Sequence, residues 1–157
     1  MEACNIGCWN VKGVNSRKKQ DTLVDFCNVK KIGIYAFLET KVRGKKLNEL
    51  MENKFVNWNH YSSANTEGRL LVVWRKSFVR VIVIAESSQL VHCYVKMTSA
   101  VFDFCITFVY GFNTAEARKN LWEEMKNLRF PVKSWLVVGD FNAVFELDDR
   151  IGEKTLL

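Results

Sequence analysis

The sequence predicts an α/β protein in which helices cover β-sheets, a layered architecture rather than a helical bundle. Segments with helical spacing of apolar residues alternate with short segments rich in β-branched and aromatic residues. The middle of the chain is a succession of strand-like segments, which indicates a mostly antiparallel block. With 48% hydrophobic and 13% aromatic residues, the 157-residue chain can bury one core, and we expect a single domain over residues 1–157.

The first third of the chain predicts two strands and two helices. The expected order is a strand at Asn5–Asn10, a helix at Arg17–Lys31 and a strand at Ile32–Leu38. A second helix follows, and its apolar face comprises Leu47, Leu50, Met51 and Phe55.

The rest of the chain predicts a block of strands, one more helix and one more strand. Asn113 and Glu116 resemble a capping box at the start of the helix, and Ser134–Val138 reads as the last strand. We expect the chain to end in mid-fold, with Ile151–Leu157 as a tail. The block of strands comprises Asn59–Ser62, Arg69–Trp74, Val79–Ala85, Leu90–Met97 and Phe102–Val109, and the helical face comprises Leu121, Met125 and Leu128.

Composition limits the class of protein. The formal net charge of +6 favours a polyanionic partner without establishing one. No apolar segment approaches the roughly 20 residues of a membrane span, and the N-terminus lacks a signal-peptide pattern, so we expect a soluble intracellular protein with no membrane partner. The cysteines are odd in number and form no CxxC pair, so we expect reduced core residues: Cys4, Cys8, Cys27, Cys93 and Cys105.

Four predicted strands end in the same way, at a polar residue that can bind a metal or a phosphate. These residues are Asn10, Glu39, Tyr110 and Asp140. Because the carboxyl ends of strands in α/β sheets commonly form the rim of a ligand site, the four residues could converge on one cleft.

Each of these residues also has an ordinary structural interpretation. Asn10 could close a turn, Glu39 could be a solvated strand end, and Tyr110 could be a strand aromatic. Asn113 could be a helix N-cap, and Lys41 could be a solvated surface lysine.

The segment Trp135-Leu-Val-Val-Gly-Asp-Phe-Asn142 is more specific than the single residues. A buried strand followed by glycine, an acid and then an amide is hard to explain by packing alone. Gly139 would let the backbone turn, and Asp140 and Asn142 would then point to the same side.

The motifs that carry these residues resemble those of the endonuclease/exonuclease/phosphatase family, in order and approximate spacing. The runs Val11-Lys-Gly-Val-Asn-Ser16 and Gln89-Leu-Val-His92 are similar to the endonuclease domains of plant LINE-type (non-LTR) retrotransposons in particular. The family motifs here are Trp9-Asn10-Val11, Leu38-Glu39-Thr40-Lys41, Tyr110-Gly-Phe-Asn113 and Gly139-Asp-Phe-Asn142.

The resemblance implies a DNase I-like fold, a four-layer α/β/β/α sandwich of two packed, mainly antiparallel sheets flanked by helices. It also implies a Mg²⁺-dependent (or Mn²⁺-dependent) phosphodiesterase site. Carried over to this chain, the metal would be bound by Glu39 and supported by Asn10. Tyr110 and Asn113 would hold the phosphate, with Lys41 as a further cation, while Asp140 and Asn142 would activate the attacking water.

The sequence departs from the family pattern at two points. Lys12 stands where many members have an acid, which puts a second metal carboxylate in doubt. The C-terminal Asp-His pair of the family does not occur in the chain, and we expect His60 and His92 to be structural or surface residues. The expectation is therefore a C-terminally truncated domain.

We therefore expect a fragment, inactive or weak by itself, of an endonuclease that nicks DNA, with RNA as the alternative nucleic acid. The parent protein would continue into a reverse transcriptase and be nuclear if functional, and exposed strand edges of the fragment would favour self-association. One alternative is a family phosphatase or RNase with another substrate. Another is a non-catalytic, nucleic-acid-binding remnant, whose candidate contacts are Arg17–Lys19, Lys30–Lys31 and Lys41–Lys46.

Overall fold

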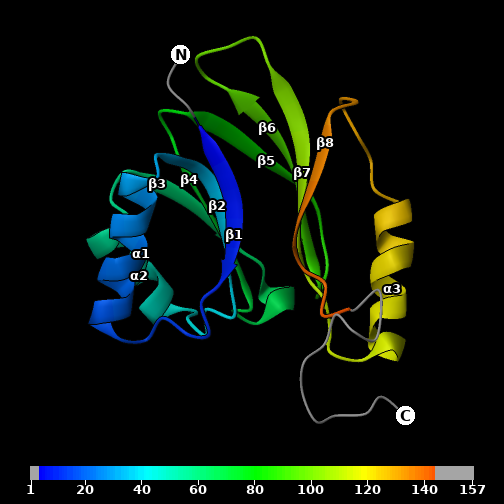
Figure 1. The fold of residues 1–157 in the computed structure, drawn as a ribbon, viewed down its shortest axis with the longest axis horizontal. Helices are drawn as coiled ribbons and strands as arrows, with labels where there is room; N and C mark the ends of the chain where they lie inside the picture. The colour runs from blue at the N-terminus through cyan, green and yellow to red at the C-terminus, as the bar shows by residue number, and fades with distance from the viewer. Residues whose placement is uncertain (1–3, 144–157) are drawn as a thin grey trace.

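A computed structural model describes residues 4–143, which form two packed β-sheets with helices on their outer faces (Figure 1). The first sheet has the order β1-β2-β4-β3, and β1 is parallel to β2, while the other neighbours are antiparallel. Its strands are β1 (Asn5–Asn10), β2 (Ile32–Leu38), β4 (Leu70–Arg75) and β3 (Trp58–Ser62), and a short 3₁₀ helix, η1 (Ala64–Thr66), precedes β4.

The second sheet has the order β5-β6-β7-β8, with one parallel pair between β7 and β8. Each sheet therefore combines one parallel pair with antiparallel neighbours, and the predicted α/β/β/α sandwich is confirmed. The strands are β5 (Val79–Glu86), β6 (Leu90–Met97), β7 (Asp103–Tyr110) and β8 (Trp135–Asp140).

The alternation of side chains along β2 shows how the layers form. Ile34, Ala36 and Leu38 face the second sheet, whereas Tyr35 and Phe37 face the helices. All residues of β2 are buried, because both faces of this central strand are covered. The strand is therefore apolar from end to end, and the first residue free to be polar is the one that follows it.

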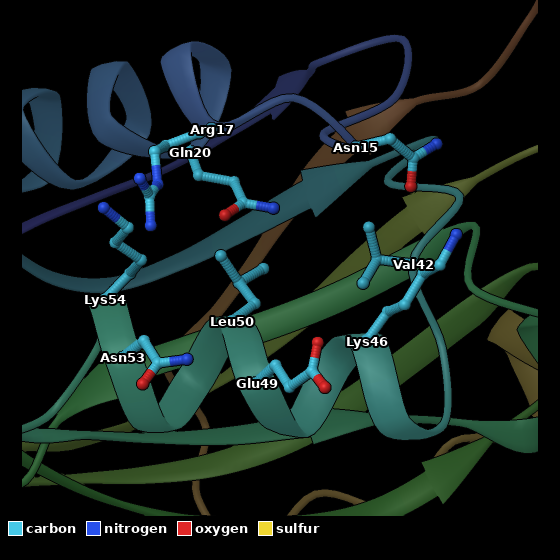
Figure 2. Close-up of a pocket in the computed structure, with 9 residues that line it drawn as sticks. All are labelled: Asn15, Arg17, Gln20, Val42, Lys46, Glu49, Leu50, Asn53 and Lys54. Carbon is cyan, nitrogen blue, oxygen red and sulfur yellow. The ribbon is translucent and has the colours of Figure 1, made fainter.

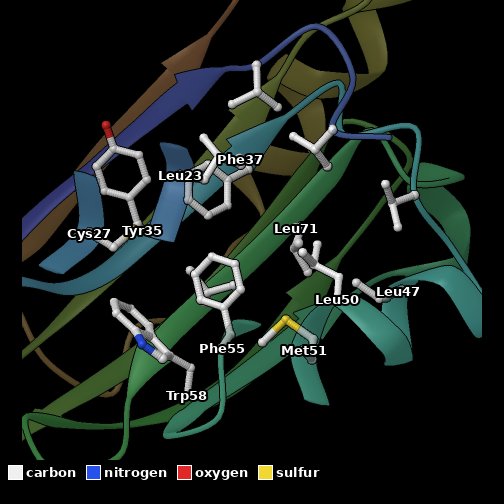
Figure 3. Packing of buried hydrophobic residues seen from close by; sticks show 14 of the residues in the cluster. Leu23, Cys27, Tyr35, Phe37, Leu47, Leu50, Met51, Phe55, Trp58 and Leu71 are labelled. Carbon is white, nitrogen blue, oxygen red and sulfur yellow. The ribbon is translucent and has the colours of Figure 1, made fainter. Parts of the chain in front are cut away.

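Helices α1 (Arg17–Val29) and α2 (Lys45–Lys54) cover the outer face of the first sheet (Figure 1). Ser16 caps α1, and its hydroxyl accepts a hydrogen bond from the backbone N–H of Lys19 at 3.3 Å. Figure 3 shows the buried cluster between these helices and β2 and β4, which includes Leu23, Cys27, Leu50, Met51, Phe37 and Leu71.

Helix α3 (Ala115–Lys126) covers the second sheet, where Leu121 is fully buried against Leu90 and Val109. The predicted capping box at Asn113 and Glu116 is wrong. Thr114 has extended backbone angles, and its hydroxyl accepts from the N–H of Ala117 at 3.2 Å, so Thr114 is the N-cap.

Other differences from the predicted elements are confined to their ends. The predicted strands at Asn5–Asn10, Ile32–Leu38 and Leu90–Met97 have the observed bounds, and the remaining strands differ by one or two residues at an end. Helix α1 ends at Val29 rather than Lys31, because Lys31 has a positive φ of 48° and turns the chain into β2. The predicted tail at Ile151–Leu157 lies outside the described residues.

The cysteines are free thiols, as expected. Cys27, Cys93 and Cys105 are buried. Cys8 on β1 and Cys4, directly before β1, pack against the core between the sheets. Within residues 4–143, no helix is long and apolar enough to span a membrane.

Candidate active site

On each sheet, the row of side chains that faces the other sheet is apolar and finishes with a polar residue at the same end of the sandwich. The predicted polar residues therefore converge at that end. Along β1 the series Ile6, Cys8 continues to Asn10, and along β7 the apolar series continues to Tyr110. On β8, Asp140 follows Val138 on the same side of the sheet, and in the strand register it is aligned with Tyr110 on the neighbouring strand β7. Strands β1 and β8 also lie against each other. One end of the apolar core is therefore closed by polar side chains from both sheets.

Glu39 lies at the centre of this arrangement, directly after β2. Its φ of +55° turns the chain out of the strand. The backbone is held on both sides, because the N–H of Glu39 donates to the carbonyl of Arg69 at 2.7 Å and its carbonyl accepts from the N–H of Gly13 at 2.6 Å. The positive φ is therefore maintained by hydrogen bonds to two other loops.

Two side chains from different sheets donate to the same oxygen of Glu39. The amide nitrogen of Asn10 lies 3.0 Å from Oε1, and the Tyr110 hydroxyl donates to Oε1 as well. Among the hydrogen bonds made by residues 4–143, none involves Oε2 of Glu39. The side chain is only partly buried, so this second oxygen is available to a ligand.

These contacts lower the pKa of Glu39 below its ordinary value. The hydrogen bond from Tyr110 is the main cause, followed by the one from Asn10, and the charges of Lys41 and Lys12 act in the same direction against the effect of burial. Glu39 is therefore a carboxylate at neutral pH.

The pKa of Tyr110 shifts in the opposite direction. Burial raises the pKa of its phenol most, the hydrogen bond to Glu39 and the charges of Glu39 and Asp140 raise it further, and Arg69 opposes them. The phenol therefore keeps its proton at physiological pH and acts as a hydrogen-bond donor.

Asp140 and Asn142 form a turn directly after β8. The N–H of Asn142 donates to Oδ1 of Asp140 at 2.9 Å, and the Asn142 amide donates to the carbonyl of Gly111 at 2.7 Å. A Cβ at Gly139 would lie 2.0 Å from the carbonyl oxygen of Val109, so only glycine lets β8 approach β7 at this position. The predicted Gly-Asp-Phe-Asn segment is thus fixed to the end of β7.

The structure places the remaining predicted residues at the rim. Lys41 is exposed and influences Glu39 through its charge. Asn113 is exposed, and its side chain forms no hydrogen bond with any other residue in the described range 4–143. Of the predicted site residues, Asn10 and Tyr110 are joined to Glu39 by side-chain hydrogen bonds. Asp140 is aligned with Tyr110 in the register of β7 and β8, and it accepts a hydrogen bond from the backbone N–H of Asn142.

Two residues of the site were not predicted as site residues. The Arg69 guanidinium lies over the ring of Phe112, 4.6 Å from its centroid, and donates to the carbonyls of Thr66 at 3.1 Å and Ser88 at 2.8 Å. Arg69 precedes β4, which is antiparallel to β2, so the start of β4 lies beside the end of β2. A strand-pairing argument could have found it.

Buried Gln89 is the second of these residues. Its amide oxygen accepts from the N–H of Phe112 at 2.7 Å, and its amide nitrogen donates to the carbonyl of Ala117 at 3.1 Å. Gln89 therefore fixes the loop that follows Tyr110 to the start of α3. The signals in the sequence were a polar residue at the head of an apolar strand and its place in the run Gln89-Leu-Val-His92, which resembles LINE-type endonuclease domains but gives no role to Gln89.

The histidines lie elsewhere in the sandwich. His92 is fully buried on β6, with its ring nitrogens 2.8 Å from Oγ1 of Thr107 and 2.9 Å from the carbonyl of Arg129. Burial lowers the pKa of His92 and that of His60, which is half-buried on β3. Neither imidazole contacts Glu39, and His92 is a structural residue, as expected.

The donor set at this end of the sandwich fits a hard cation. Glu39 offers one ionised carboxylate, and Asn10 lies beside it with an amide oxygen that accepts from the N–H of Lys12 at 3.2 Å. In residues 4–143, no group of three or more His, Cys, Asp and Glu side chains gathers. A site with one or two carboxylates and room for water or phosphate suits Mg²⁺, which keeps much of its hydration shell.

Solved structures share this fold. An endonuclease/exonuclease/phosphatase family protein from Bacteroides thetaiotaomicron superposes with a TM-score of 0.67 at 12% identity, over 87% of this chain and 62% of that one. The endonuclease domain of TRAS1, a telomere-specific non-LTR retrotransposon, gives 0.65 at 16% identity, over 89% and 61%. D. rerio TDP2 complexed with a single-stranded DNA product gives 0.62 at 12% identity, over 88% and 60%.

These similarities establish a fold shared with endonuclease/exonuclease/phosphatase proteins. The chain spans about three fifths of the length of these three structures. No protein-family model and no curated protein matches the sequence.

Proposed function

We propose that the chain carries the metal- and phosphate-binding side of a Mg²⁺-dependent phosphodiesterase site that nicks DNA, as in LINE-type retrotransposon endonucleases. The observation that supports this proposal most is the convergence of Asn10 and Tyr110, from two different sheets, on one oxygen of Glu39. A structural carboxylate does not need donors from both sheets at the open end of a core, whereas a metal-binding carboxylate needs a fixed position.

In this proposal Glu39 is the principal metal ligand, and Asn10 holds its carboxylate in place or contributes its amide oxygen. Tyr110 stays protonated, and its hydroxyl would turn from Oε1 of Glu39 to donate to the phosphate when substrate binds, while Asn113 and Lys41 would bind the phosphate from the rim. Asp140, positioned by Asn142, accepts a proton from the attacking water. A bound Mg²⁺ (or Mn²⁺) supplies charge stabilisation for the phosphate oxygens.

Nucleic acid is the substrate class that the charge and the structural similarities favour. The chain has a formal charge of +6, and the structures of similar fold include a retrotransposon endonuclease domain and a DNA-product complex. We propose DNA as the substrate, a reverse transcriptase as a further part of the parent protein, and the nucleus as its site of action.

The proposal also concerns the activity of these 157 residues by themselves. The family resemblance requires a C-terminal Asp-His pair, and His92 cannot take its place, because both of its ring nitrogens are engaged in the second sheet. We therefore propose that this chain alone is inactive or very weakly active.

A non-catalytic, nucleic-acid-binding protein is the second candidate. Exposed basic residues at the starts of α1 and α2 support it, because binding through them does not need Glu39. A family phosphatase or RNase remains a third reading of the same metal site, and the choice of substrate decides between them.

A plasmid-nicking assay tests the proposed function. Supercoiled DNA is incubated with Mg²⁺ and either this chain or a longer form that includes the C-terminal Asp-His pair, each with Glu39→Ala, Asp140→Ala or the control Glu52→Ala. Glu52 is an exposed acid on the surface of α2, so its loss should leave nicking unchanged. We expect nicking by the longer form, and its loss with Glu39→Ala and with Asp140→Ala.

The other results separate the candidates. DNA binding that survives Glu39→Ala, without nicking by either form, would favour the non-catalytic protein. Nicking of RNA alone, or hydrolysis of phosphomonoesters alone, would move the proposal to another substrate. Strong nicking by the 157-residue chain would show that the Asp-His pair is not required.

A further inference from the structure

A polar cavity lies on the outer side of the first sheet, between α1 and α2 (Figure 2). Its volume is about 560 Å³. The residues before and at the start of α1 form one wall, and one face of α2 forms the other. The polar residues that matter are Asn15, Arg17 and Gln20 on the first wall and Lys46, Asn53 and Lys54 on the second.

Three cations, Arg17, Lys46 and Lys54, line this cavity against one acid, Glu49. Lys54 forms an ion pair with Asp21, and Glu49, which also lines the cavity, lies 3.9 Å from Lys45. In the described part of the chain, Arg17 and Lys46 form no ion pair. The cavity lining therefore carries a net positive charge, with one cation that forms no ion pair on each wall.

Two of the neutral donors at the cavity are also unoccupied. The side chains of Asn15 and Asn53 make no hydrogen bond with other residues in the range 4–143. Gln20 differs from them, because its amide nitrogen already donates to the carbonyl of Val14 at 3.0 Å. Amide N–H groups beside two free cations are the donors that bind phosphate oxygens.

Both helices begin with basic residues, against the preference of the helix dipole. The first turn of α1 has no acid and begins with Arg17, and the first turn of α2 has no acid and begins with Lys45 and Lys46. The N-cap of α2 is Gly44, which provides no side-chain hydrogen bond. These choices disfavour each helix alone, but they favour an anion near the helix starts.

The cavity is connected to Glu39 by two loops that hold each other. One loop runs from Asn10 to Asn15 and the other from Glu39 to Lys46. They are joined by hydrogen bonds from the N–H of Gly13 to the carbonyl of Glu39 at 2.6 Å and from the N–H of Val14 to the carbonyl of Thr40 at 3.0 Å. The loop that begins at Glu39 and the loop that leads to α1, each of which contributes to the cavity lining, are therefore fixed to each other.

We propose that the cavity between α1 and α2 binds backbone phosphates of the nucleic-acid substrate at a distance from the cleaved bond. This inference rests on the proposed nuclease function. Arg17 and Lys46 bind the phosphate oxygens from the two walls, and Asn15 and Asn53 donate beside them. The site recognises the backbone rather than the base sequence, because cations and amides at a polar wall contact phosphates.

Fluorescence anisotropy tests this site without any nicking. A labelled DNA duplex is titrated in EDTA at several salt concentrations with the chain, with Arg17→Gln/Lys46→Gln, and with Arg80→Gln/Lys96→Gln. The last variant removes the same charge from a cross-strand pair on exposed positions of β5 and β6. We expect the cavity variant to bind about tenfold more weakly and to lose about one unit of salt slope for each cation removed, with little change in the control.

Equal weakening of the two double variants, or no DNA binding by the chain, would overturn the proposal. Unlabelled DNA should compete better than tripolyphosphate at the same phosphate concentration. Equal competition would assign the cavity to a small polyphosphate instead. Because EDTA removes any metal, a failure here is distinct from a failure to nick plasmid DNA with Mg²⁺.

Discussion

At the scale of single residues, Glu39 depends on Tyr110 for its low pKa. The phenol is the largest cause of the shift, so Tyr110→Phe should raise the pKa of Glu39 toward its ordinary value of 4.5. Carbon-13 NMR titration of the Glu39 carboxyl group measures this change. Tyr61→Phe is the matched control, because it removes a hydroxyl that donates to a different carboxylate, that of Glu86.

The same pair of variants has an expected pH dependence. The folded-state pKa of Glu39 is depressed, so its contribution to stability is fully present above the unfolded pKa and is lost as the pH falls through the folded value. The stability difference between the wild type and Tyr110→Phe should therefore shrink below about pH 4.5. An unchanged pKa of Glu39 in Tyr110→Phe would contradict the assigned hydrogen bond.

Residue types at strand ends allowed most of the site to be predicted. Asn10, Tyr110 and Asp140 end apolar strands, and Glu39 follows one, so a polar residue at each place was itself informative. The positions of Arg69 and Gln89 depend on which strands are neighbours and on the fold of the Tyr110–Asn113 loop. Both stand at strand starts, and although Gln89 belongs to a run that resembles LINE-type endonuclease domains, no role in the site could be assigned to either residue without the pairing.

At the scale of elements, the close approach of β8 to β7 depends on Gly139. Gly139→Ala would place a methyl group against the carbonyl of Val109, and we expect a loss of about 1–3 kcal/mol or more in the free energy of unfolding. Urea denaturation measures it. Arg80→Ala on exposed β5 is the control, with an expected change within about 0.5 kcal/mol. Similar losses in the two variants would show that β8 has room for a side chain.

Periodicity predicted the elements well and their ends less well. Apolar spacing identifies a buried face, as in α3 with Leu121, but the start of a helix is set by the residue whose hydroxyl reaches a free N–H. Asn113 and Thr114 are both residue types that favour the N-cap position, and only the backbone angles identify Thr114 as the N-cap. The end of α1 was likewise decided by the turn at Lys31.

At the scale of the whole molecule, β8 is an edge strand with apolar residues on its surface. In residues 4–143, its hydrogen-bonded neighbour is β7 on one side only, and Leu136 is 40% exposed. Such an edge can pair with another chain, so we predict concentration-dependent self-association.

Analytical ultracentrifugation measures this association. Leu136→Lys places a charge on the edge and should reduce it, whereas Val101→Lys, at the fully exposed tip between β6 and β7, should not. If the wild-type protein is monomeric at all concentrations, the edge of β8 is not an interaction surface.

The layered fold could be predicted from the order of elements, but the meeting of the two sheets at one polar end could not be derived from periodicity alone. Periodicity assigns a residue to a face and leaves the partner of that face open. Here the inward series of β1 and β7 end beside each other, which brings Asn10 and Tyr110 to the same carboxylate oxygen. The family resemblance supplied this pairing in advance.

The central claim is that Glu39 is a metal-binding carboxylate, and the binding of Mn²⁺ to the 157-residue chain tests it most directly. Free Mn²⁺ is measured by electron paramagnetic resonance for the wild type, for Glu39→Gln and for Glu52→Gln, an exposed control on α2 that lies outside the cavity between α1 and α2. We predict that Glu39→Gln weakens binding at least about tenfold and that Glu52→Gln leaves it unchanged. Equal Mn²⁺ affinity in the wild type and Glu39→Gln would contradict the account.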